Sequence, residues 1–180
     1  LIMFQYERDA QRVYEAIIRR MELFGLELSK EKTRILPFGR NCGTRETFDF
    51  LGFTHFNSKT RKGYYSVGHK ISRKKKKQFK SNLKKWVKEN RDKQFDEFMK
   101  KLNKKLTGSF NYYSLSGMIR EVRSLWIHSL YVTFKWMNRR SQRRSFKLER
   151  FYEIWHERII HPYIHVDIWS GDKVIYNKKV

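Results

Sequence analysis

The sequence has one cysteine, two prolines and fewer than half as many acidic as basic residues. Cys42 on its own excludes an intrachain disulfide and a cysteine-based zinc site, as is usual in a reducing compartment. The longest apolar stretch, residues 125–137, contains His128, Ser129, Thr133 and Lys135, and is too short to span a bilayer. Nothing in the sequence resembles a secretory signal. These absences favour a chain that works without disulfides and without a membrane.

What the sequence has in excess is positive charge. Its 180 residues include 41 Lys and Arg against 18 Asp and Glu, a formal net charge of +23. Such charge opposes compaction unless a polyanion neutralises it, so we expect nucleic acid as the partner. An apolar content of 39% still supports one compact domain or two small subdomains.

The first third of the sequence predicts a strand, a helix and two more strands. Leu1 to Phe4 have the composition of a strand interior, which indicates that the chain begins within a larger domain. Apolar residues spaced by three to four predict a helix over residues 9–24, ended by Gly25. Leu26 with Leu28, and Ile35 with Leu36, then predict a short hairpin.

After this first hairpin, the sequence predicts a second hairpin and a group of helices. The apolar runs 47–56 and 64–67 can pair across a turn. After Gly68 the apolar spacing becomes helical, around Phe79 to Val87, Phe95 to Leu106 and residues 116–138 and 144–158, with an extended tail after Pro162. We therefore expect an α+β fold divided near residue 68, with residues 1–68 mixed and residues 69–180 mainly helical.

The strongest signal for binding is a run of cations around the first of these helices. Phosphate contacts made by such side chains release counterions and make binding sensitive to salt. The alternative is a solvated helix face. The run comprises Lys70, Arg73, Lys74, Lys75, Lys76, Lys77, Lys80, Lys84, Lys85 and Lys88.

A second cluster contains Arg139, Arg140, Gln142, Arg143 and Arg144, at the predicted end of the third helix. Its arginines can bind phosphate bidentately, or can merely complement the helix dipole.

Tyr112 and Tyr113 are candidates for stacking on bases, with burial in the core as the alternative. His156, His161 and His165 do not predict a metal site, because Pro162 breaks any helix that would align them and no cysteine accompanies them. Carboxylates are scattered, so the sequence predicts no two-metal centre and no catalytic residue of its own.

Three segments together resemble the C-terminal part of a group II intron reverse transcriptase/maturase. Residues 25–33 (GLELSKEKT) resemble a late palm motif, residues 48–53 (FDFLGF) resemble the primer grip, and residues 136–146 (WMNRRSQRRSF) resemble the distal thumb or maturase region. The resemblance implies the end of a palm subdomain, residues 1–68, followed by a helical thumb/maturase region, residues 69–180.

The resemblance also implies what this chain lacks and what it holds. In the family, a Tyr-X-Asp-Asp turn whose aspartates bind catalytic Mg²⁺ directly precedes the strand that matches Leu1 to Phe4. That turn is missing here, so the chain alone is expected to be inactive and to need an upstream fingers/palm segment. Phe50, Leu51, Gly52 and Phe53 would support the primer end, although a buried palm strand is the alternative. Lys32 would neutralise the triphosphate or assist protonation of the leaving group, or would be a surface turn lysine.

By the same resemblance, the basic helices would grip an RNA/DNA template-primer and bind intron RNA to assist splicing. A nuclease domain is not expected. The expected setting is a ribonucleoprotein in the bacterial cytoplasm or an organelle. The alternative is a non-enzymatic RNA-binding splicing cofactor, a degenerate maturase.

Overall fold

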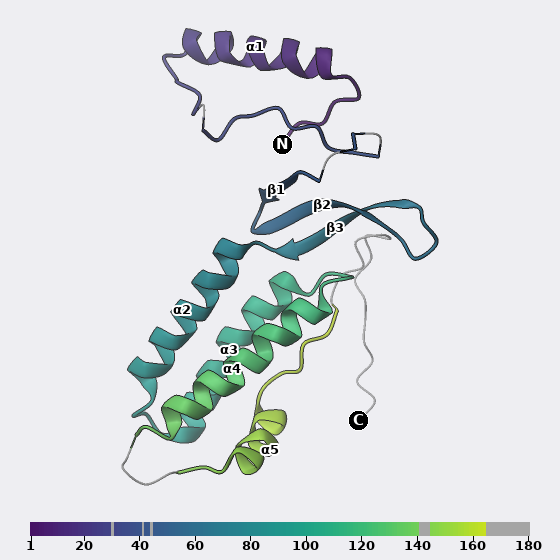
Figure 1. Ribbon diagram of the computed structural model, residues 1–180. Helices are drawn as coiled ribbons and strands as arrows, with labels where there is room; N and C mark the ends of the chain where they lie inside the picture. Colours follow the sequence, from purple (N-terminus) through teal and green to yellow (C-terminus); the bar gives the residue numbers. More distant parts are fainter. Residues whose placement is uncertain (30, 41, 44, 141–144, 165–180) are drawn as a thin grey trace. The chain divides into compact units, whose positions relative to one another are not determined.

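The computed structural model describes residues 1–164 except 30, 41, 44 and 141–144 (Figure 1). These residues form a mixed fold, which confirms the α+β class. Its elements are α1 (Glu7–Leu23), β1 (Thr47–Phe50), β2 (Phe53–Lys59), β3 (Tyr65–Ile71), α2 (Arg73–Asn90), α3 (Phe95–Tyr113), α4 (Ile119–Met137) and α5 (Leu148–Arg158). They belong to two compact units: residues 1–48 with 56–67, and residues 49–55 with those from 68 onward.

Helix α1 dominates the first unit and agrees with the sequence. It ends where Gly25 adopts a φ of 66° and donates its backbone N–H to the Glu22 carbonyl. The strand predicted at residues 1–4 and the hairpin predicted at 26–36 are wrong, since neither segment is a strand. Leu26 and Ile35 are 58% and 41% exposed, so neither the alternation of Leu26 and Leu28 nor the adjacent pair Ile35 and Leu36 marks a half-buried strand.

The sheet contains three antiparallel strands in the order β1-β2-β3, where the sequence predicted a two-stranded hairpin. The apolar run 47–56 is broken because Leu51 and Gly52 have φ values of 50° and 84°. Two consecutive positive φ values are the geometry of a tight hairpin connection. The run therefore forms two strands and the turn between them.

The second unit has its core between α2, α3, α4 and α5, as the helical spacing predicted. α2 contributes Leu83 and Val87, and the core includes Trp126 and Trp155, which are 6% and 0% exposed. α3 continues to Tyr113 through Gly108, so the predicted end before that glycine is wrong. An interior glycine costs a helix about 1 kcal/mol relative to alanine, which the buried apolar stripe of α3 offsets. The stripe comprises Phe98, Met99, Leu102, Leu106 and Phe110.

The segment after α5 is held against the helices by polar contacts. Trp126 Nε1 donates to the Ile160 carbonyl at 3.1 Å, and the Ile160 N–H donates to Asn103 Oδ1 at 2.9 Å. His156 Nδ1 and His161 Nε2 lie 2.8 Å apart. The sequence indicated that Pro162 would keep these histidines from aligning, yet the chain turns back after Arg158 and brings the two rings together.

Four histidines of the second unit predict acid sensitivity. Burial lowers the pKa of His55, His69, His128 and His161 below the usual 6.5, and His156 and Arg123 lower that of His161 further. The unfolded chain therefore binds more protons than the native chain as these groups titrate. We expect the free energy of unfolding to fall as pH decreases through 6.5 towards the native pKa values. Urea unfolding followed by circular dichroism from pH 8 to pH 5 measures this, and His161→Gln should flatten part of the dependence.

Candidate nucleic-acid interface

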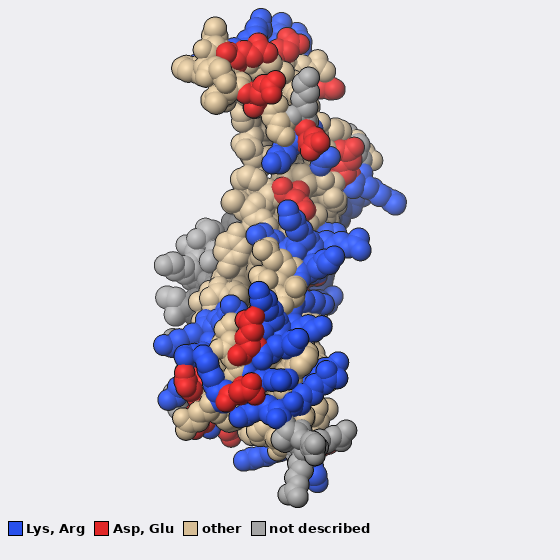
Figure 2. Space-filling model, turned by 90° about the vertical axis from the view of Figure 1, so that its left-hand side faces the viewer, with Lys and Arg blue, Asp and Glu red and all other residues tan. Residues whose placement is uncertain are grey.

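One side of α2 is a continuous row of exposed lysines, which we call the α2 lysine face: Lys77, Lys80, Lys84 and Lys88. Their spacing of three and four residues places them along one side of the helix. Figure 2 shows Lys and Arg side chains gathered over α2, with few acidic ones. In the described part of the chain, no carboxylate lies within 4 Å of these four amines. No carboxylate of the described residues thus compensates the positive charge on this face.

The first turn of α2 adds to this charge in an unfavourable way. It contains no acidic residue, while Arg73, Lys74 and Lys75 are exposed there. Cations near the positive end of a helix dipole cost about 0.3–1 kcal/mol each at low ionic strength. Ser72 caps the helix by accepting a hydrogen bond from the Lys75 N–H at 3.4 Å. A bound polyanion would relieve the repulsion that remains.

Two lysines of the basic run predicted to bind nucleic acid, Lys76 and Lys85, lie close to carboxylates. Lys76 forms an ion pair with Glu121 at the start of α4, and its side chain is only 33% exposed. Lys85 lies 3.9 Å from Glu89. The Lys76–Glu121 pair joins the starts of α2 and α4, while Lys88 reaches Trp136 near the ends of both helices. The two helices therefore run parallel, and the α2 lysine face borders α4.

Trp136 lies at the centre of a group of cations. Lys88 Nζ and the Arg91 and Arg139 guanidinium carbons lie 5.0, 5.6 and 5.1 Å from the centroid of its ring. Each cation–π contact stabilises by about 0.5–1 kcal/mol at an exposed site, which holds like charges together that would otherwise repel. Sequence reasoning found Lys88 and Arg139 but missed Arg91, because Arg91 follows the end of α2 and stands outside the run.

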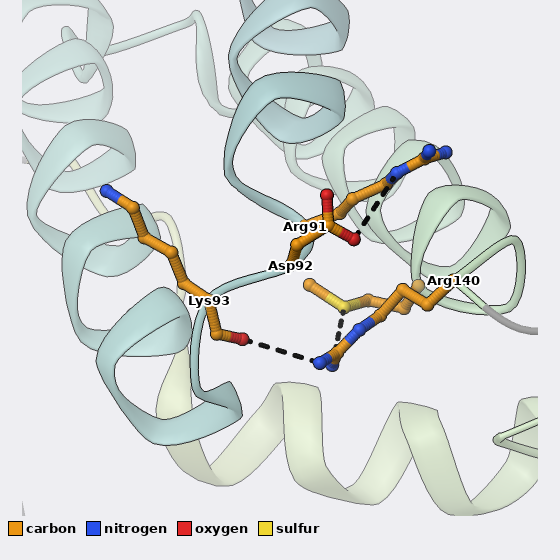
Figure 3. Close-up of polar contacts among 5 residues, drawn as sticks. Arg91, Asp92, Lys93 and Arg140 are labelled. Atoms are coloured by element: carbon orange, nitrogen blue, oxygen red, sulfur yellow. Dashed lines mark hydrogen bonds and ion pairs between the residues drawn. The ribbon is translucent and has the colours of Figure 1, made fainter.

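Arg140 connects the end of α4 to the turn between α2 and α3 (Figure 3). Its guanidinium donates to the Lys93 carbonyl at 3.5 Å and to the Met137 sulfur at 3.8 Å. Arg91 Nε lies 3.8 Å from Asp92 in the same turn. The Arg140 side chain thus has protein partners, and its hydrogen bonds tie the end of α4 to this turn.

The rest of the arginine segment, Gln142, Arg143 and Arg144, lies outside the described residues. Its two flanks are joined by Asn138. The Asn138 side-chain amide donates to the Phe146 carbonyl at 3.0 Å, and its Oδ1 accepts from the Phe146 N–H at 2.8 Å. One side chain therefore fixes where the segment leaves and rejoins the helices.

The two candidate tyrosines differ in environment. Tyr112 is 51% exposed, stacks on Phe53 with ring centroids 5.6 Å apart, and donates its hydroxyl to the Leu51 carbonyl at 2.5 Å. Tyr113 is 9% exposed and belongs to the core. Burial raises the pKa of the Tyr113 hydroxyl. Of the two rings, Tyr112 is the one accessible to a ligand.

The turn that resembles a primer grip is exposed and anchored. Phe50 and Leu51 are 39% and 67% exposed, whereas Phe53 packs partly against the core. The Gly52 carbonyl accepts a hydrogen bond from the Ser72 N–H at 2.9 Å. Together with the Tyr112 bond to Leu51, this fixes the backbone of the turn to α2 and α3.

Opposite effects on stability are expected at the two residues of this turn. Gly52→Ala should lower the free energy of unfolding by about 1–2 kcal/mol, because its φ is 84° and a Cβ there would lie 3.4 Å from Lys75 Cγ. Leu51→Asn should raise it by up to about 1 kcal/mol, because asparagine tolerates the φ of 50° better than leucine. Urea denaturation measures both, and a change of the same sign at both positions would contradict the strained turn.

The remaining predicted residues include two exposed lysines, Lys32 and Lys70. Lys32 is exposed in a turn of the first unit, where its backbone N–H donates to the Ser29 carbonyl at 3.0 Å. Lys70 is exposed on β3. His165 lies outside the described residues, which contain no group of three or more His, Cys, Asp or Glu side chains able to hold a metal ion. No helix within the described ranges is long and apolar enough to cross a membrane.

Comparison with known families decides the identity of this helical region. Residues 76–153 match the family model of the group II intron, maturase-specific domain. The chain contains a group II intron maturase domain. The match begins in α2, includes α3 and α4, and ends in α5. No curated protein and no solved structure showed significant similarity to the chain.

The family match confirms the resemblance to the maturase region noted from the sequence, and it gives the maturase domain its role in splicing and its partner, group II intron RNA. All four residues of the α2 lysine face lie inside the matched range, as do Arg91 and Trp136. The exposed lysines without a carboxylate partner in the described residues thus lie within the segment that matches the maturase domain.

Proposed function

We propose that this maturase domain binds intron RNA through the α2 lysine face and the cations around Trp136. The single observation that carries the proposal is that four exposed lysines without carboxylate partners lie within the segment matched to the maturase family. RNA phosphates would neutralise this charge and release their counterions, which favours binding at low salt. Bound RNA would then be stabilised in the folded form that splices.

A splicing assay tests this directly. A group II intron transcript that splices poorly at low Mg²⁺ should splice faster when the full chain is added, and the chain with the α2 lysine face neutralised should not accelerate it. If both proteins accelerate splicing equally, the α2 lysine face is not part of the RNA interface. Because the assay reads RNA products, it does not depend on any polymerase activity.

We further propose that the chain is the nucleic-acid-gripping portion of an RNA-directed DNA polymerase, with residues 1–68 as the end of the palm and residues 69–180 as the thumb. The anchored, exposed Leu51–Gly52 turn supports this proposal, because a rigid backbone close to α2 suits a primer end. Phe50, Leu51, Gly52 and Phe53 would hold the primer, and Mg²⁺ would be bound by aspartates of an upstream fingers/palm segment. The setting would be a ribonucleoprotein in the bacterial cytoplasm or an organelle.

Primer extension by the chain joined to an upstream segment that carries a Tyr-X-Asp-Asp turn tests the polymerase proposal. Magnesium-dependent extension that Gly52→Ala weakens would support it. Splicing assistance without extension of any primer would instead identify a non-enzymatic splicing cofactor.

A further inference from the structure

A hollow lies between α2 and α3 of the maturase domain. Its volume is 130 Å³, and its lining comes from two helices: Phe79, Asn82 and Leu83 from α2, and Lys105, Leu106 and Ser109 from α3. Leu83 and Leu106 are 1% and 0% exposed, so the floor is apolar core surface. We propose that this hollow binds one unpaired nucleobase of the RNA, an inference that rests on the proposed RNA-binding function.

The size of the hollow limits what can occupy it. Pockets for drug-sized ligands enclose about 300–1,000 Å³, so 130 Å³ is too little for a nucleotide or a folded peptide. A space of this size suits a single planar ring system. The sugar and phosphate would then stay outside, on the helix surface.

The chemistry of the lining fits a base better than an apolar group. Phe79, partly buried against the core, supplies an aromatic wall beside the apolar floor. Asn82 is exposed, and its amide offers both donors and an acceptor, the combination that pairs with a base edge. Ser109 Oγ donates to the Lys105 carbonyl at 3.2 Å, so its lone pairs remain to accept. A bound apolar group would bury the polar atoms of Asn82 and Ser109 without giving them hydrogen-bond partners.

Positive charge at the rim provides for the phosphates. Lys105 lines the hollow, and its Nζ lies 6.0 Å from the centroid of the Trp86 ring. Lys85 is one helical turn from Asn82, and its side chain is 77% exposed. RNA is commonly read through bases that leave the stack and lie against aromatic side chains, with cations on the adjoining backbone. The hollow and its rim provide both parts.

The test compares two short RNA hairpins, one with a fully paired stem and one with a single unpaired adenosine in the same stem. The full chain should bind the second hairpin more tightly by roughly tenfold, as stacking of one base allows. Asn82→Ala should remove this preference and leave affinity for the paired hairpin unchanged. Phe79→Leu should do the same, since it keeps the apolar volume and loses the ring. Asn111→Ala, the same substitution on the exposed surface of α3, is the matched control and should keep the preference.

Each outcome has one meaning. Equal affinity of the unaltered chain for the two hairpins, or a preference that survives Asn82→Ala and Phe79→Leu, overturns the base-binding proposal and leaves RNA binding by the α2 lysine face intact. Failure to bind either hairpin at low salt overturns the RNA-binding function itself, and with it the inference. Adenosine replaced by 2-aminopurine gives an independent readout, because its fluorescence should fall when the base enters the hollow and should not fall with Asn82→Ala.

Discussion

Replacing Lys77, Lys80, Lys84 and Lys88 together by glutamine should lower the dependence of RNA affinity on salt. Each lost phosphate contact reduces the slope of log K against log salt by about 0.7–0.9, so four contacts reduce it by about 3. Between 50 and 200 mM salt, the unaltered chain would therefore lose about sixty-fold more affinity than the variant. Filter binding of intron RNA across this range measures the effect.

The matched control removes the same charge from α1. Arg8, Arg12, Arg19 and Arg20 are all exposed there, in the other compact unit, and their replacement by glutamine leaves the same net charge as the lysine variant. This control should keep most of the slope of the unaltered chain. Equal loss of slope in both variants would show that total charge, and not the α2 lysine face, governs binding.

Phe98→Ala should lower the free energy of unfolding of the helical unit by about 3–5 kcal/mol. Phe98 is 0% exposed, and its ring centroid lies 5.3 Å from that of Trp86. Its loss removes buried apolar surface and leaves a cavity that neighbours fill only in part. Urea denaturation measures the change. Phe24→Ala is the control, because Phe24 is 69% exposed and its truncation should change stability by no more than about 0.5 kcal/mol.

The helices could be predicted from the sequence because their apolar stripes are long and regular. α2, α3 and α4 each repeat the three-to-four spacing over several turns, and burial of that stripe decides their structure. The sequence predicted that α3 ends before Gly108, because glycine disfavours a helix interior. Burial of apolar residues before and after Gly108 outweighs that low helix propensity. Leu26 and Ile35 misled in the opposite direction, because an apolar pattern predicts a strand only where a partner strand and a covered face exist.

The charge of the candidate interface could be predicted from the sequence, but its geometry could not. Lysines at helical spacing could be read directly from the sequence, whereas the pairing of Lys76 with Glu121 joins residues far apart along the chain. The approach of Arg91 to Trp136 depends in the same way on how α2 lies against α4. The hollow lined by Phe79 and Asn82 is likewise set by the packing of two helices, which composition and periodicity do not specify.

The double hydrogen bond between Asn138 and Phe146 ties the end of α4 to the residues that lead into α5. The two residues are eight positions apart in the chain, and one asparagine side chain holds both the N–H and the carbonyl of Phe146. A displacement that bound RNA causes at the end of one helix would therefore be passed to the other helix through this single side chain.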